Sequence, residues 1–287
     1  MAGAIDRAER FNLLDAEPGP SQLLSLREIQ IFASGILEVF AIYCEAHRYR
    51  YSLGAGTLLG AARHQGFIPW DDDVDVFMPR PDYEMLLDNQ RDFESVTGTH
   101  LELIGSKDKR DAIFFKVCSN SLRARSDGAA FDEYLWIDVF PIDGLPDDER
   151  AVRWIFNRVK PWQRVIAVAR RTPDSARNRA RYVVKAITKP IIDALGLERV
   201  AARRVTAVAK SLPFGETRNS GLITWANGQH VISSDAFGWG YELLFEGRKY
   251  SVVRDWDSCL SHAYGDYMQL PPESQRVSHG LKVWREE

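Results

Sequence analysis

The sequence contains little cysteine. Its three cysteines, Cys44, Cys118 and Cys259, are odd in number, far apart and include no CxxC pair. This pattern argues against a disulfide framework or a zinc knuckle and fits a reducing compartment. The 287 residues also contain no internal repeat and no low-complexity segment. They are enough for one large domain, or for a core domain with an insertion.

The first nineteen residues have scattered charges and no continuous apolar stretch. We therefore expect neither a secretory signal nor a membrane span there, and we expect a cytoplasmic protein that can lie at the inner membrane face. A composition of 45% hydrophobic and 27% charged residues is that of an ordinary globular protein.

The net charge of −3 conceals a strong asymmetry. Residues 150–210 hold sixteen Lys and Arg against three acids, a charge of +13, so the rest of the chain carries −16. Such a block suggests an anionic partner, which can be a phosphate-rich acceptor, a membrane surface or nucleic acid. The alternative is a solvated helical face whose Arg stems cover apolar surface. Within the block, the apolar and basic residues 152–169 fit either a helix on an anionic membrane or a helix packed on the core.

The spacing of apolar residues predicts alternating helices and strands. Helices are expected over residues 22–48 (with Ser21 as the N-cap), 56–66, 82–93 and 255–264, and strands over 50–55, 74–78, 100–104, 113–118 and 135–140. This alternation indicates an α/β or α+β sheet domain. Residues 141–148 are rich in turn formers and predict a boundary. The basic segment after it is expected to be helical, with interruptions at Pro161, Pro173 and Pro190.

Four carboxylates in five positions, Asp71, Asp72, Asp73 and Asp75, are costly to place together. Like charges a few ångströms apart raise each other's pKa unless a cation intervenes. Oxygen-rich clusters of this kind suit Mg²⁺ or Mn²⁺. Asp73 and Asp75 would share one face of an extended strand, whereas Asp72 would point away as an exposed or capping carboxylate.

Other interpretations of the acidic run stay open. It can be a solvated loop, or the metal-binding DxD of a sugar-nucleotide glycosyltransferase. An EF-hand is excluded, because Val76 stands where its loop needs Gly and Asp82 where it needs Glu.

The context of the run favours a metal site. A Gly-rich strand-to-helix turn (Gly54, Gly56, Thr57) precedes it and offers backbone N–H groups to a phosphate. Asp138 stands alone in an apolar strand, where it needs a partner or a cation. A Gly turn, a DxD and a third Asp on a neighbouring strand are the plan of the nucleotidyltransferase palm, where carboxylates grip the ions that bridge the phosphates.

Longer motifs carry a resemblance to a known family. They are GTLLGA (56–61), Arg63-His64, GFIPWDDDVD (66–75), MPRPDY (78–83), IDVFPIDG (137–144), FEG (245–247), YGDY (264–267), LPP (270–272) and His279. From about Ser52 to His279 the sequence resembles the LicD family, which shares its core with fukutin-related proteins. The resemblance implies transfer of a substituted phosphate, often phosphocholine, from a CDP-activated donor to a glycan hydroxyl. Related members use CDP-polyols.

These observations together predict an α+β fold: a nucleotidyltransferase-like mixed sheet with flanking helices and a basic helical insertion. We divide the chain into an N-terminal helical region (1–50), the core (51–148), the basic insertion (149–212) and C-terminal strands and helix that complete the fold (213–287).

The predicted site has two parts. Asp71, Asp73, Asp75 and Asp138 would hold Mg²⁺ or Mn²⁺, and Asp73, Asp75 and Asp138 would be catalytic, with Asp138 accepting the proton of the attacking hydroxyl. Substrate contacts are expected from Gly56, Thr57, Arg63, Lys116 and His279; Arg63 and Lys116 can instead pair with nearby acids. Trp70, Trp136 and Tyr83 can face a quaternary ammonium or belong to the core.

Three functions remain. The first is transfer of a substituted phosphate from a CDP-activated donor to a glycan or lipid-linked glycan, with residues 150–210 against an anionic membrane and no nucleic-acid partner. The second is nucleotidyl transfer to a small-molecule or sugar acceptor at the same metal site. The third is a non-catalytic binding module that has kept the fold.

Overall fold

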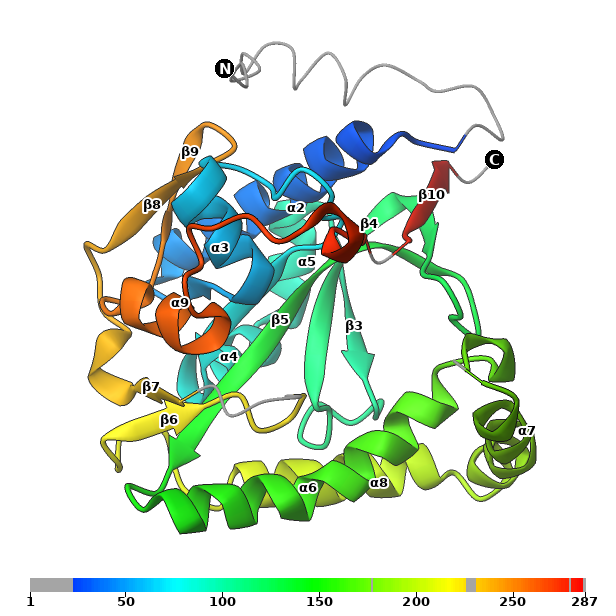
Figure 1. Ribbon diagram of the computed structural model, residues 1–287. Helices are drawn as coiled ribbons and strands as arrows, with labels where there is room; N and C mark the ends of the chain where they lie inside the picture. The colour runs from blue at the N-terminus through cyan, green and yellow to red at the C-terminus, as the bar shows by residue number, and fades with distance from the viewer. Residues whose placement is uncertain (1–22, 177, 226–230, 279, 286–287) are drawn as a thin grey trace.

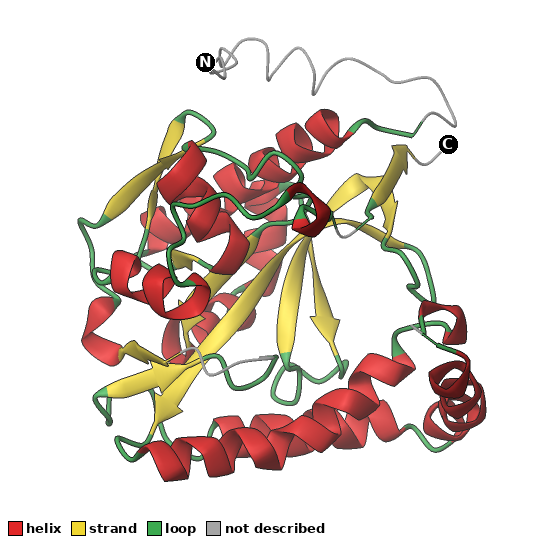
Figure 2. Ribbon diagram, viewed as in Figure 1, coloured by secondary structure: helices red, strands yellow, loops and turns green. Residues whose placement is uncertain are grey.

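The computed structural model describes residues 23–176, 178–225, 231–278 and 280–285. A mixed β-sheet lies between helices (Figures 1 and 2). Helices also follow one another along its lower end, where the basic segment of the sequence is found (Figure 1). The predicted α+β class is therefore confirmed.

The sheet has eight strands, and its longest two lie at its centre. Its main path runs β1 (Ser52–Leu53), β2 (Asp75–Pro79), β5 (Glu133–Leu145), β4 (Phe114–Arg125) and β10 (Lys282–Arg285). Off this path, β3 (His100–Ile104) pairs with β4, and β6 (Asn219–Gly221) joins β5 to β7 (Val231–Ser233). The β2–β5 pair is parallel, and the other described pairs are antiparallel. A separate hairpin is formed by β8 (Glu242–Phe245) and β9 (Arg248–Ser251).

The two faces of the sheet differ because side chains alternate along a strand. Val76 and Val139 point to one face and pack in the core with α2 (Leu26–His47). Phe77 and Phe140 point to the other face and belong to a second core that includes residues of the basic segment. The alternation gives each face its own apolar support, and the carboxylates of the site share the second face.

Helix α2 is a core helix. It starts at Ser25, whose hydroxyl and backbone form a capping box with Glu28. The expected cap, Ser21, lies outside the described residues. By length and composition α2 is the one described helix that could cross a membrane, with a mean hydropathy of 1.5. However, 61% of that stretch is buried within the fold, as expected of a helix packed on a sheet.

The remaining helices of the core are short: α3 (Ala55–His64), α4 (Arg80–Asp88), α5 (Gln90–Thr97) and α9 (Trp256–Tyr264). The single helix predicted over residues 82–93 is two helices that meet at Asn89. Pro81 lies in the first turn of α4, where its missing N–H costs nothing.

The basic segment is helical, as predicted. It forms α6 (Glu149–Ala169), a short 3₁₀ turn (Pro173–Ser175), α7 (Arg179–Ala194) and α8 (Leu197–Ala209). The predicted interruptions at Pro161 and Pro190 are wrong, since both residues lie inside helices. Both prolines are exposed, so water can bind the carbonyl groups that lose their intrahelical partner.

The turn-rich boundary predicted over residues 141–148 is also partly wrong. Residues 141–145 continue β5, and Pro141 pairs in register with Met78.

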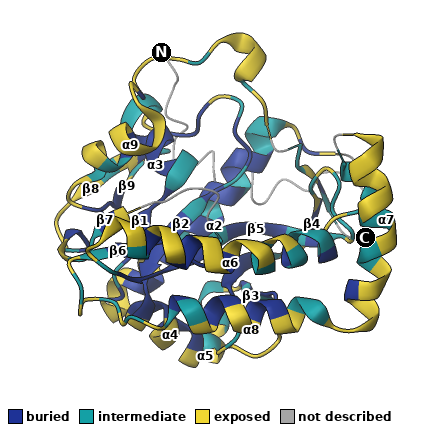
Figure 3. Ribbon diagram, turned by 60° about the horizontal axis from the view of Figure 1, so that its bottom comes forward, coloured by how far each residue is buried: buried dark blue, intermediate teal, exposed yellow. Residues whose placement is uncertain are grey.

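Helix α6 packs on the core through its apolar side. Ile155, Val159 and Ile166 are buried, and α6 lies beside α8 below the sheet (Figures 1 and 3). Of the two interpretations of residues 152–169, the packed helix describes the structure.

A buried ion pair ties α4 to the end of β5. The Arg80 guanidinium donates two hydrogen bonds of 2.7 Å to the two carboxylate oxygens of Asp143, and both side chains are buried. Arg80 also lies over the Tyr83 ring, 5.1 Å from its centre. The pair explains why the MPRPDY and IDG motifs, sixty residues apart in the chain, carry these charges.

We expect Arg80→Met to destabilise the fold by about 3–5 kcal/mol, because it leaves the Asp143 carboxylate buried without its counter-charge. Urea unfolding measures the change. The matched control is Arg153→Met, which removes an exposed pair with Glu149 and should stay within about 0.5 kcal/mol of the parent. Equal stability of the two variants would contradict this account.

Candidate functional site

Asp75 and Asp138 are brought side by side by the parallel pair of strands. They are register partners in β2 and β5, and the Asp138 backbone N–H donates to the Val74 carbonyl at 2.8 Å. Partners in register share a face of the sheet, so the two carboxylates project together. The structure thus unites residues 63 positions apart, as predicted.

Asp71 and Asp73 approach the pair from the segment before β2. Asp73 does not lie on the strand, which begins at Asp75. Burial raises the pKa of Asp75 well above its usual range, and the charges of Asp73, Asp138 and Asp71 add to the rise. Burial also raises the pKa of Asp138 to about 6, with Lys116 opposing and Asp73 reinforcing the shift. The charges of Asp71, Asp73 and Asp138 therefore all act on Asp75.

One oxygen atom of the cluster is left without a hydrogen bond. Among the described residues, Oδ1 of Asp138 is buried without a hydrogen-bond partner. In the described part of the chain, no three His, Cys, Asp or Glu side chains converge closely enough to form a metal site as they stand. The carboxylates are neighbours, and the predicted metal site stays a prediction.

The Gly-rich turn packs directly against the acidic run. Gly54 is the N-cap of α3, and Ala55 adopts a φ of 39°, a conformation that is strained for a residue with a side chain. A Cβ at Gly56 would lie 2.9 Å from Oδ2 of Asp71. Thr57 is buried, and its hydroxyl oxygen accepts a 2.8 Å hydrogen bond from the Asp75 backbone N–H. The start of α3 is therefore held against Asp71 and Asp75.

Asp72 points away from the cluster, as expected. Its Oδ2 accepts a hydrogen bond of 2.9 Å from the Leu281 backbone N–H, just before β10, and so anchors a loop rather than capping a helix. The alternative that it is exposed is wrong, because only 3% of its surface is accessible. Gln30 of α2 donates to the Asp71 carbonyl at 2.9 Å. The acidic run is thus fixed from both ends of the chain.

Glu246 is a residue whose role the sequence did not reveal. Its Oε1 accepts a 3.2 Å hydrogen bond from the Phe67 backbone N–H, and both its carboxylate oxygens accept from Arg27. A Cβ at Gly66 would lie 2.5 Å from the same Oε1. The FEG motif did single out Glu246 as an isolated acid in a tight turn. Nothing in the sequence indicated that its carboxylate binds residues 66–67.

Among the described residues, Arg63 binds a carbonyl and a histidine and forms no ion pair with an acid. Its Nη1 donates to the Tyr267 carbonyl at 2.7 Å, and its Nε donates to Nε2 of His64 at 3.0 Å. Burial lowers the pKa of Arg63, and burial together with Arg63 lowers the pKa of His64. His279 lies outside the described residues.

Lys116 takes the alternative predicted for it, a salt bridge. Its Nζ lies 3.0 Å from Glu133 and 3.3 Å from the centre of the Trp136 ring, and it is buried. It is also the register partner of Asp138, and its charge lowers the pKa of that carboxyl against the effect of burial. Lys116 therefore lowers the pKa of Asp138 through its charge, while its ammonium group forms a salt bridge with Glu133.

A cavity of about 600 Å³ adjoins the acidic run. Leu59, Arg63, Trp70 and Tyr264 are among the residues that line it, together with the YGDY and LPP motifs. Burial raises the pKa of the Tyr264 hydroxyl to about 12, and the charges of Asp75, Asp71 and Asp73 add to this. Tyr264 thus lines the cavity within reach of the charges of the carboxylates, a position that the YGDY motif alone did not disclose.

The aromatic residues considered for a cationic head group have other partners. Tyr83 is fully buried, Lys116 covers Trp136, and Arg276 lies 5.2 Å from the centre of the Trp70 ring. Of the three, Trp70 lines the cavity.

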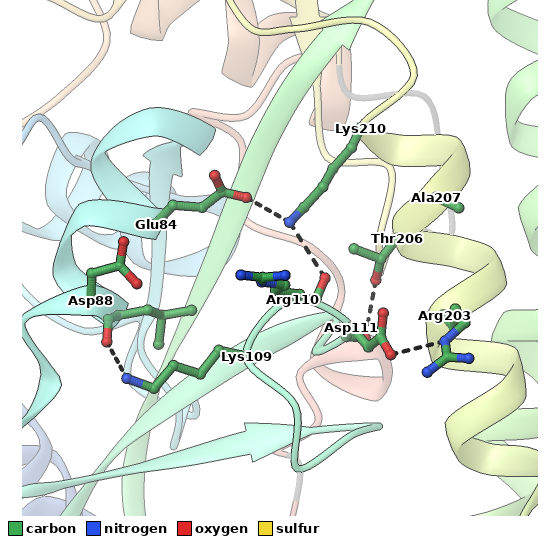
Figure 4. Close-up of a pocket in the computed structure, with 10 residues that line it drawn as sticks. Glu84, Asp88, Lys109, Arg110, Asp111, Arg203, Thr206, Ala207 and Lys210 are labelled. Atoms are coloured by element: carbon green, nitrogen blue, oxygen red, sulfur yellow. Dashed lines mark hydrogen bonds and ion pairs between the residues drawn. The ribbon is translucent and has the colours of Figure 1, made fainter.

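Another cavity, of about 440 Å³, lies away from the carboxylates (Figure 4). It lies between α4, the residues before β4 and α8, and its charged groups are largely paired with one another. Lys210 lies 2.6 Å from Glu84, and Arg203 lies 3.0 Å from Asp111 (Figure 4). These pairs join α8 to the core.

Comparison with known proteins agrees with these features. The family model "LicD/FKTN/FKRP, nucleotidyltransferase domain" matches residues 48–164, a range that contains all four carboxylates of the cluster. The resemblance to the LicD family is confirmed, and the chain is a LicD-like phosphotransferase.

Two kinds of relative define this similarity. The lipopolysaccharide cholinephosphotransferase LicD of Haemophilus influenzae is 29% identical over 266 residues, which cover 90% of this chain and 97% of that protein. The ribitol 5-phosphate transferase FKRP of mouse and of human is 46% identical over 57 residues, 20% of this chain and 10% of each relative.

We expect Thr57→Val to lower stability by about 1–3 kcal/mol, because the Asp75 N–H loses its acceptor. Thr57→Ser keeps the hydroxyl oxygen and should stay close to the parent. Urea unfolding of the three proteins measures the difference. If valine and serine behave alike, the hydroxyl does not hold Asp75.

Proposed function

We propose that this protein transfers a substituted phosphate, phosphocholine or a similar group, from a CDP-activated donor to a hydroxyl of a cell-surface glycan or its precursor. The observation that carries the proposal is the pairing of Asp75 with Asp138 beside the first turn of α3. The activities for which the relatives are named support it, since both are transferases of substituted phosphates. A nucleotidyltransferase-like fold is part of the proposal, supported by the domain match over residues 48–164.

A divalent ion fits the residues that are present. The buried Oδ1 of Asp138 needs a partner, and the buried charge of Asp75 is opposed by its neighbours. Asp71, Asp73, Asp75 and Asp138 would hold Mg²⁺ or Mn²⁺, hard ions that favour carboxylate oxygens. The ion would supply positive charge to the donor diphosphate.

The protein's own groups position the substrates. The N-terminal turn of α3 offers backbone N–H groups and a helix dipole to a donor phosphate. Asp138 takes the proton of the attacking hydroxyl, so that the oxygen bonds to the phosphorus distal to the nucleoside and CMP leaves. We place the acceptor in the 600 Å³ cavity, where Arg63, Trp70 and Tyr264 can contact a sugar. His279 stays a predicted substrate contact.

We further propose a cytoplasmic location at the inner membrane face, with residues 150–210 against anionic lipid. Their charge of +13 supports this. A lipid-linked glycan would then be presented at that surface.

Removal of divalent metal by EDTA should abolish CMP release, and Mg²⁺ or Mn²⁺ should restore it. Asp75→Asn and Asp138→Asn should each lower kcat by about 100-fold or more, because several kcal/mol of charge stabilisation depend on these oxygens. Asp72→Asn is the matched control: it is a neighbouring residue with the same substitution, and its amide oxygen can still accept from Leu281. A loss of equal size in Asp72→Asn would show that any change in the run disables the protein.

The reaction itself is tested by incubation with CDP-choline, CDP-ethanolamine, CDP-glycerol or CDP-ribitol, Mg²⁺ and a panel of sugars. The proposal expects CMP release and a sugar that gains the substituted phosphate, both measured by mass spectrometry. Free phosphocholine with CMP attached to the sugar would establish nucleotidyl transfer instead. No turnover with any donor would favour a non-catalytic binding module.

A further inference from the structure

Helix α7 is poorly buried. Of its sixteen residues, Ile192 alone is buried among those whose side chains are described. It lies at one end of the layer formed by α6 and α8, apart from the sheet, and is exposed along most of its length (Figures 1 and 3). It touches α6, α8 and the 3₁₀ turn at Pro173–Ser175. Packing in the core therefore does not account for the amino-acid sequence of this helix.

The exposed side of α7 is apolar. Val184, Ile187, Ile191 and Leu195 are 60%, 61%, 51% and 66% exposed. At 3.6 residues per turn they fall within an arc of about 80°, so they form one continuous stripe along the helix and its C-cap. Isolated exposed apolar residues are ordinary, but an aligned stripe marks a contact surface.

The same helix is basic. It carries Arg179, Arg181, Lys185 and Lys189 against one acid, Asp193, which pairs with Lys189 at 3.1 Å. Lys185 and Lys189 also donate to Ser175 and to the Ala169 carbonyl, which holds the helix against the protein with its stripe outward. The surrounding segment is basic as well, with exposed arginines at 171, 199, 203 and 204.

We propose that α7 docks on the surface of an anionic lipid bilayer, with Val184, Ile187 and Ile191 in the headgroup and acyl boundary and the exposed Arg179 and Arg181 on the headgroups. An apolar stripe flanked by Lys and Arg is the pattern of a helix that lies in the interface. Sixteen residues with four cationic side chains are too few and too polar to span a bilayer. A second copy of this chain is disfavoured, because a twofold contact would bring equal positive charges together.

This surface narrows the lipid contact proposed above for residues 150–210 to α7, and it rests on that part of the proposed function. Residues 152–169 have the right composition, but their apolar side is buried in the core. The docking of α7 does not depend on the proposed reaction, since lipid binding requires no turnover.

The experiment is flotation of the full chain with vesicles of phosphatidylcholine alone or mixed with phosphatidylglycerol. We expect binding to the mixed vesicles, weakened by salt, and little binding to the neutral ones. Val184→Glu should weaken partitioning by about tenfold or more, since it removes inserted apolar area and places a carboxylate against anionic lipid. The matched control is Val96→Glu on α5, a valine that is 67% exposed, which should bind like the parent.

Three results would overturn the proposal. These are equal binding to neutral and anionic vesicles, parent-like binding by Val184→Glu, or equal losses in both glutamate variants. Analytical sedimentation without lipid tests the alternative that a second copy of the chain covers the stripe. A parent protein that is dimeric, with a Val184→Glu variant that is monomeric, would assign the stripe to that dimer. Circular dichroism and CMP release from the donor should be unchanged in Val184→Glu, so that a loss of binding is separate from misfolding and from the reaction.

Discussion

The parallel pairing of β2 with β5 places two carboxylates side by side where water is scarce. Asp75 and Asp138 cannot move apart without breaking the backbone hydrogen bonds of the pair. Burial raises the pKa of both, and the negative charge of Asp73 adds to the rise at each. Holding these two carboxylates together costs free energy. A cation bound there would lower that cost, because its charge would offset the repulsion and it would give the buried oxygen of Asp138 a partner.

Neighbouring residues from several elements hold the acidic run in place. Thr57 binds the Asp75 backbone, Gln30 binds the Asp71 carbonyl, and Asp72 binds the Leu281 N–H. The bonds from Thr57 and Gln30 go to main-chain atoms of the acidic run and fix its path, whereas the bond to Leu281 is made by the Asp72 carboxylate itself.

The sequence predicted the class of fold and the union of Asp75 with Asp138, because strand alternation and an acid in an apolar run are local patterns with few interpretations. The strand limits of β3 were predicted correctly for the same reason. Pro161 was misjudged because its effect on a helix depends on whether the freed carbonyl meets water, which sequence does not tell. Glu246 and Tyr264 were given no role, since their partners are about 180 residues away in the chain and only the tertiary fold identifies them. Lys116 was ambiguous until Glu133 was seen beside it.

The contacts of Glu246 and Leu281 also bear on the order in which the molecule can form. The loop at residues 66–75 belongs to the first quarter of the chain, yet two groups that fix it are made near the end of synthesis. Loops that close over such distances form late, because their entropy is lost before the contacts are gained. A nascent chain that ends before Glu246 would carry every carboxylate of the site and still lack both of these contacts. The C-terminal residues therefore complete the anchoring of this loop after the β2–β5 pair that bears Asp75 and Asp138 has been synthesised.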